Sequence, residues 1–70
     1  MATAFSAVLK RDGEWWYGWV EEVPGVNGQG RSRAACVASL RFALKEALEM
    51  NRTEAIAAAG TGYERVSIEL

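Results

Sequence analysis

The segment GEWWYGWVEEVPG holds four of the seven aromatic residues of this 70-residue chain, and it limits how the layers of the fold can be arranged. Its composition predicts a β-strand, in which successive side chains point to opposite faces. Trp15, Tyr17 and Trp19 then lie on one face, and Trp16 and Val20 lie on the other. Because a single helix packed on the sheet covers only one of these faces, the other face must be covered by something else.

The length of the chain predicts a single domain, residues 1–70. A domain of this size buries only about 60% of the surface that its unfolded chain exposes, and it is usually held together by disulfides, metals or association. The chain has one cysteine, Cys36, and no histidine. Neither an intrachain disulfide nor a zinc site is therefore expected, and no cofactor is predicted. Self-association is the remaining way to stabilise the domain, so a homodimer or a homotetramer is favoured.

The distribution of charge and apolar residues favours a cytoplasmic protein without membrane contact. No stretch approaches the ~20 apolar residues of a membrane span, and the first residues lack the basic start of a secretory signal. The net charge is −1, with five basic and two acidic residues over 31–52 and an acidic remainder. Since nucleic-acid binders usually carry a strongly basic stripe, this weakly basic segment is more typical of a solvated helix face.

Local patterns predict three strands followed by a helix. The strands are expected over about residues 3–11, 14–21 and 26–29, with Asp12-Gly13 as a hairpin turn. Ser32 is expected to cap a helix of about five turns, whose apolar residues recur at spacings of three and four. The residues of this stripe are Cys36, Val37, Leu40, Ala43, Leu44, Ala47 and Leu48.

The end of the chain predicts the topology. Thr53 can cap a short second helix that Gly60 ends, and residues 63–70 alternate as a last strand. A strand after a packed helix returns by a right-handed crossover, parallel to a strand of the sheet. We therefore predict an α+β fold, β-β-β-α-β, with a mixed sheet of strand order 3-2-1-4 and the main helix on the face of Trp16. Gly18 on that face is expected to let helix and sheet approach closely.

The chain shows no constellation typical of an enzyme, so no catalytic or metal-binding residue is assigned. A nucleophile needs a base, and Cys36 lies in the apolar stripe, where a thiol is inert. Glu21 and Glu22 are adjacent on an extended segment, so they point apart and cannot act as a pair. The segment GVNGQG lacks the lysine of a phosphate-binding loop.

The candidate functional residues are Trp15, Tyr17 and Trp19. Burial of each such side chain contributes ~2–3 kcal/mol, and monomers rarely expose apolar patches of several hundred Å². Another segment of the chain, a second copy or a different partner can cover them. A homo-oligomer through this face is favoured because a two-fold interface uses the same patch twice.

The order of motifs over about residues 3–50 resembles the HicB-like antitoxin family of prokaryotes. Members commonly show an aromatic strand, then valine, an acidic residue, an apolar residue and Pro-Gly, followed by Gln-Gly and a capped helix. The resemblance implies a partial ribonuclease-H-like fold, β-β-β-α-β. It also implies an interaction protein of a type II toxin–antitoxin system, which binds and blocks a small basic ribonuclease toxin. The corresponding residues here are Val20, Glu22, Val23, Pro24, Gly25, Gln29, Gly30 and Ser32.

The resemblance also bears on the partners. Glu21, Glu22 and Glu64 are the expected electrostatic contacts to a basic toxin. Full-length members add a C-terminal DNA-binding module, whereas this sequence ends at Leu70, directly after the last predicted strand. DNA binding is therefore not expected.

The alternative function is a single-stranded nucleic-acid-binding module. In such a module the aromatic side chains of the strand stack on bases, and neighbouring basic side chains bind the backbone. Arg31, Arg33 and Arg41 are the candidate basic residues. They are expected on a different face from the aromatic side chains, which counts against this function.

Overall fold

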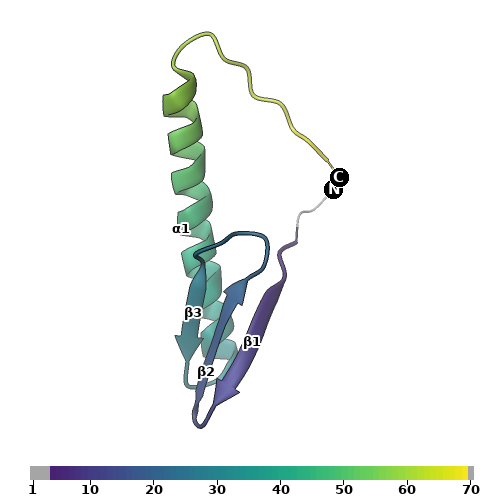
Figure 1. Cartoon of the computed structure of the whole chain (residues 1–70), viewed down its shortest axis with the longest axis vertical. Coiled ribbons are helices and arrows are strands. Elements are labelled where there is room, and N and C mark those ends of the chain that lie inside the picture. Colours follow the sequence, from purple (N-terminus) through teal and green to yellow (C-terminus); the bar gives the residue numbers. More distant parts are fainter. Residues whose placement is uncertain (1–3, 70) are drawn as a thin grey trace.

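The computed structural model describes residues 4–69 and shows a three-stranded antiparallel sheet with one long helix on one of its faces (Figure 1). The strands are β1 (Ala7–Asp12), β2 (Trp15–Val20) and β3 (Asn27–Gly30), and the helix is α1 (Arg33–Ala59). The strand order is β1-β2-β3, so the aromatic strand β2 is central.

A two-residue loop of Gly13 and Glu14 joins β1 to β2, so the predicted loop of Asp12 and Gly13 is wrong by one residue. Asp12 pairs with Trp15, and Gly13 between them has a φ of 63° while Glu14 has a negative φ. A glycine at the first loop position is the pattern of a type II′ turn, which matches the twist of the two strands. Arg11 donates a hydrogen bond from Nε to the carbonyl oxygen of Gly13, at 3.0 Å, and so ties the end of β1 to the turn.

The core is small and lies between the sheet and the first half of α1. Its four buried residues are Val20, Val26, Cys36 and Leu40, and Trp16 packs against them. The helix therefore covers the face of β2 that the alternation of side chains predicted. A core of this size leaves much of the apolar surface of the chain outside it.

The close approach of helix and sheet occurs at β3. A Cβ added to Gly28 would lie 2.9 Å from the backbone nitrogen of Leu40, and one added to Gly30 would lie 2.6 Å from the Cβ of Ala35. At Gly18 the nearest atoms belong to Val8 and Leu9 of β1 instead. The expectation that Gly18 admits the helix is thus wrong, and Gly28 and Gly30 have that role.

The helix begins where predicted but continues as one element. Ser32 accepts a hydrogen bond at Oγ from the backbone N–H of Ala35, at 3.0 Å, and Gly60 donates its N–H to the carbonyl oxygen of Ile56. The predicted short second helix is wrong, because Thr53 lies inside α1. No glycine or proline interrupts α1 before Gly60, so adding each further residue to the helix costs little free energy.

The predicted topology, β-β-β-α-β with a mixed sheet of order 3-2-1-4, is also wrong. Residues 61–69 form neither helix nor strand, and Val66 and Ile68 are 72% and 83% exposed. The last residue of the predicted strand, Leu70, lies outside the described residues. The physical reason is that α1 continues beyond the sheet, so the tail starts far from β1 (Figure 1).

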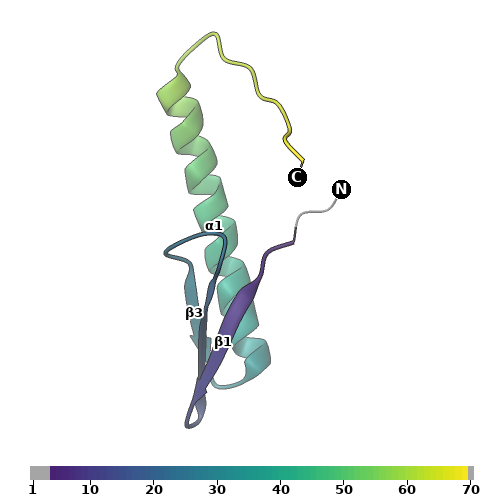
Figure 2. The same ribbon diagram turned by 45° about the vertical axis from the view of Figure 1, so that its right-hand side comes forward.

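The whole chain is elongated, with extents of 52 × 24 × 15 Å and a radius of gyration of 15.2 Å. A compact domain of this length has a radius of gyration of about 11 Å. Figure 2 shows the two causes, which are the free second half of α1 and the tail that descends beside it. Within residues 4–69, no helix has the length and hydropathy that a membrane crossing requires.

Candidate interaction surface

The three candidate aromatic residues lie together on the sheet face opposite α1. Trp15, Tyr17 and Trp19 are 45%, 37% and 39% exposed, whereas Gly18 and Val20, which point to the helix, are buried. We call Trp15, Tyr17 and Trp19 the aromatic face. The structure places them as a row along the central strand, where a partner can contact all three.

The strand register shows which side chains flank the aromatic face. Lys10 lies opposite Tyr17 on β1, and Val8 lies opposite Trp19. Gln29 and Asn27 occupy the matching positions on β3. Directly opposite residues of an antiparallel pair share one face, so two polar side chains border the aromatic row on the β3 side, and Lys10 and the apolar Val8 border it on the β1 side.

One arginine joins the aromatic face. The guanidinium carbon of Arg31 lies 5.0 Å from the centroid of a Trp15 ring, which is cation–π geometry. The expectation that the arginines and the aromatic side chains lie on different faces is therefore wrong for Arg31. Arg41 lines a hollow between α1 and β1, so the three candidate arginines do not form one basic stripe.

The three candidate acidic residues come from two separate segments. Glu21 and Glu22 directly follow β2, whereas Glu64 lies in the tail, which begins at the far end of α1 (Figure 1). Glu22 already has a partner, since its Oε1 accepts a hydrogen bond at 2.9 Å from the backbone N–H of Ser6. Glu21 donates its backbone N–H to the carbonyl oxygen of Ser6, so this strand pair continues past β1.

The carboxylate of Glu22 is stabilised by hydrogen bonds from nearby backbone N–H groups. The Ser6 backbone N–H is the main cause that holds the pKa of Glu22 below its ordinary value, and the residue's own backbone N–H adds to it. Hydrogen bonds to the charged form of a carboxyl group favour that form. Glu22 therefore fixes the segment before β1 in addition to any role toward a partner.

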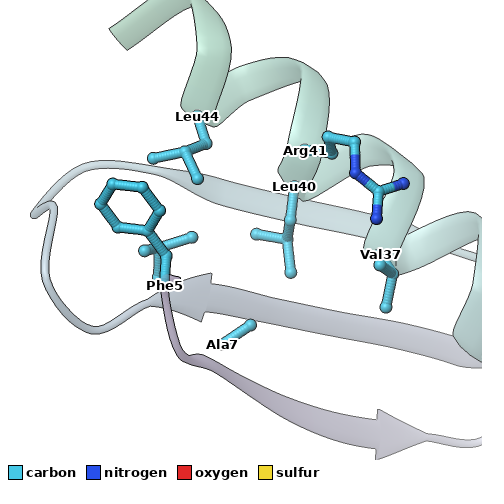
Figure 3. Close-up of a pocket in the computed structure, with 7 residues that line it drawn as sticks. Phe5, Ala7, Val37, Leu40, Arg41 and Leu44 are labelled. Atoms are coloured by element: carbon cyan, nitrogen blue, oxygen red, sulfur yellow. The ribbon is translucent and has the colours of Figure 1, made fainter. Parts of the chain in front are cut away.

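A second surface, which the sequence did not reveal, lies between β1 and α1. A hollow of about 370 Å³ is lined from the strand side by Phe5 and Ala7 and from the helix side by Val37 and Leu44 (Figure 3). The fourth strand that the sequence pattern predicts beside β1 would fill this hollow, so no hollow was expected there. The position of Lys10 opposite Tyr17 does not follow from the predicted Asp12-Gly13 loop, which would pair Lys10 with Trp15.

The described part of the chain shows no cluster of three acidic or cysteine side chains able to hold a metal ion. Cys36 is buried in the core, where its Sγ lies 3.8 Å from the carbonyl oxygen of Gly28. The exposed aromatic row is thus the most prominent feature for recognition. Comparisons with protein-family models, with curated proteins and with solved structures find no match to this chain.

Proposed function

We propose that this chain is a small interaction protein that acts through its aromatic face, first by binding a second copy of itself. The observation that carries the proposal is the row of Trp15, Tyr17 and Trp19, exposed on a sheet face that α1 does not cover. Large aromatic side chains contribute most of the binding energy of many interfaces. The four-residue core makes association a natural source of additional stability.

A substitution on the aromatic face tests this proposal. We expect Trp19→Glu to lower the oligomer mass without unfolding the chain, because Trp19 points away from the core and its charge would be buried in the interface. Native mass spectrometry measures the mass, and circular dichroism measures the fold. Phe42→Glu is the matched control, because Phe42 is 66% exposed on α1. Equal masses for the wild type and Trp19→Glu would remove the aromatic face from the interface.

The identity of a different partner is proposed from the resemblance to HicB-like antitoxins. A small basic ribonuclease toxin would meet Glu21, Glu22 and Glu64, which are all exposed. The protein would then act in the cytoplasm and would itself catalyse nothing. Native mass spectrometry of the tagged chain, purified gently from its own host, tests this: a second, basic chain supports the role. Unchanged affinity for that chain after charge reversal at the three glutamates would exclude them as contacts.

Single-stranded nucleic acid is the second candidate ligand, and one observation favours it. Arg31 lies against Trp15 and Lys10 lies opposite Tyr17, so two cations share the aromatic face. Aromatic side chains that stack on bases beside cations are typical of such modules. Binding of single-stranded RNA that weakens steeply with salt and is lost in Tyr17→Ala would support this function. Binding unchanged in Tyr17→Ala would exclude it.

A further inference from the structure

The aromatic face carries two opposite charges at one end of its row, one on each side of Trp15. Asp12 lies directly opposite Trp15 on β1, so its side chain shares the aromatic face. Arg31 follows β3 on the other side, and its guanidinium carbon lies 5.0 Å from the centroid of a Trp15 ring. Both residues are exposed. An anion and a cation thus flank the end of the row that is nearest to the hairpin turn.

The fold holds these two charges apart within one chain. The central strand β2 separates β1 from β3, and neighbouring strands are about 4.8 Å apart, so about 10 Å lies between the two outer strands. The side chain of Trp15 stands between Asp12 and Arg31. Each charge is therefore available to a partner that covers the aromatic face.

The rest of the aromatic face also differs between its two sides. Lys10 on β1 lies across the row from Gln29 on β3, and Val8 on β1 lies across from Asn27 on β3. The β1 side therefore carries an apolar group and a cation before Asp12, whereas the β3 side carries two amides before Arg31. This difference makes the face sensitive to the direction in which a second copy lies on it.

Two copies that pack face to face and centred on the row can be arranged in two ways, because sheets packed in this manner keep their strands roughly aligned. If the β2 strands run in opposite directions, β1 covers β1, so Lys10 meets Lys10 and Asp12 meets Val8. If they run in the same direction, β1 covers β3 of the other copy. Asp12 then meets Arg31, and Lys10 meets Gln29. Only the second arrangement places an opposite charge or an amide against each charge, which is the complementarity that interfaces select.

We propose that two copies pack their aromatic faces with the β2 strands in the same direction, so that Arg31 of each copy forms an ion pair with Asp12 of the other. This inference rests on the proposed self-association through the aromatic face and adds the direction of the partner. A two-fold axis along β2 makes the two ion pairs identical. A guanidinium stacked on an indole keeps the N–H groups at its edge free for a carboxylate, so Trp15 positions Arg31 for this contact.

A mixture of two single variants tests the pairing between copies. In the Arg31→Glu homodimer two negative charges face each other at both contacts, and in the Asp12→Lys homodimer two positive charges do. We expect each variant alone to dimerise about tenfold more weakly than the wild type. In an equal mixture both contacts of the mixed dimer join opposite charges, so the mixed dimer should predominate and recover the affinity of the wild type. Sedimentation equilibrium measures the Kd, and native mass spectrometry separates the homodimers from the mixed dimer by mass.

Arg33→Glu is the matched control. It makes the same change of charge at an exposed residue of α1, which packs on the other face of the sheet. Its homodimer should keep the wild-type Kd, and its mixture with Asp12→Lys should give the mixed dimer only in its statistical share. Circular dichroism checks that each variant keeps the fold. A statistical share of the mixed dimer for Arg31→Glu with Asp12→Lys would overturn the proposal, including the case in which the strands run in opposite directions.

Trp19→Glu separates this inference from the proposed function. A dimer that is lost in Trp19→Glu but unchanged in the charge variants keeps the aromatic interface and loses the proposed direction. A wild-type chain that is monomeric, or whose mass is unchanged in Trp19→Glu, loses self-association through the aromatic face and this inference with it.

Discussion

At the scale of single residues, two glycines decide how closely the helix approaches the sheet. The atoms nearest to a Cβ at Gly28 or Gly30 belong to α1 and include its backbone, which cannot rotate away as a side chain can. A methyl group at either position therefore has to displace the helix. The small core loses part of its contacts when this happens, because Cys36 and Leu40 are attached to the same helix.

We expect Gly30→Ala to lower the free energy of unfolding by about 1–3 kcal/mol, the usual cost of inserting a group into a packed site. Its Cβ would lie 2.6 Å from the Cβ of Ala35. Urea denaturation followed by tryptophan fluorescence measures the change. Gln29→Ala is the control, because Gln29 is the exposed neighbour on β3 and its change should remain within about 0.5 kcal/mol. Equal stability of Gly30→Ala and the wild type would contradict the close approach.

Glu22 gives the fold a dependence on pH. Its pKa is lowered in the folded state from 4.5, first by the Ser6 backbone N–H, so its carboxylate stabilises the fold. This contribution is complete above the unfolded pKa and is lost as the pH falls through the folded pKa. We therefore expect Glu22→Ala to be less stable than the wild type at pH 7 and the difference to shrink below pH 4.5.

The measurement is thermal unfolding of the wild type and Glu22→Ala between pH 3 and pH 7, in steps of about half a unit, since carboxyl groups titrate in this window. Glu21→Ala is the control, because Glu21 contacts Ser6 through its backbone N–H, which alanine keeps. A stability difference for Glu22→Ala that stays constant down to pH 3 would contradict the role of the carboxylate.

At the scale of elements, α1 consists of two halves with different surroundings. Cys36, Leu40, Ala43, Leu44 and Ala47 pack against the sheet core. From Leu48 to Ala59 every residue except Ile56 is exposed. The same hydrogen-bonded helix therefore passes from a packed layer into solvent, and its second half depends on local propensity alone.

Hydrogen exchange should show this division. We expect the amides of residues 50–59 to exchange at least about tenfold faster than those of residues 36–47, because a helix without packing opens locally. Exchange measured by NMR on the whole chain compares both segments in one sample. Uniform protection along α1 would show that a partner packs against the second half.

The elements differ in how far the sequence alone predicts them. The hairpin and the start of α1 depend on neighbouring residues, namely Gly13 at the turn and Ser32 at the cap. These residues predict that a hairpin forms and where the helix begins, but the loop lies one residue later than predicted, because Gly13 is its first residue and Asp12 pairs with Trp15. The aromatic face follows from alternation along β2. The prediction that Thr53 caps a second helix is wrong, because a residue that is favourable as a cap is also tolerated inside a helix when good helix formers surround it.

At the scale of the whole molecule, the length of α1 relative to the sheet decides the topology. The crossover rule assumes that a chain leaving a helix is close to the sheet, and here the 27-residue helix spans about 40 Å against about 20 Å for the six residues of β1. Local sequence patterns show where a helix can begin and end, but they do not show how far it extends past the sheet. The prediction of a fourth strand beside β1, and therefore of no hollow there, failed for this reason.

Because Cys36 is buried, its reaction with a thiol reagent can report when α1 separates from β3 in the native chain. The thiol is fully buried between α1 and β3, and it is the only cysteine of the sequence. A thiol reagent reacts with an accessible thiolate, so labelling requires that the helix first separate from the strand. The labelling rate then reports how often the two layers come apart, at one known position and without any engineered label.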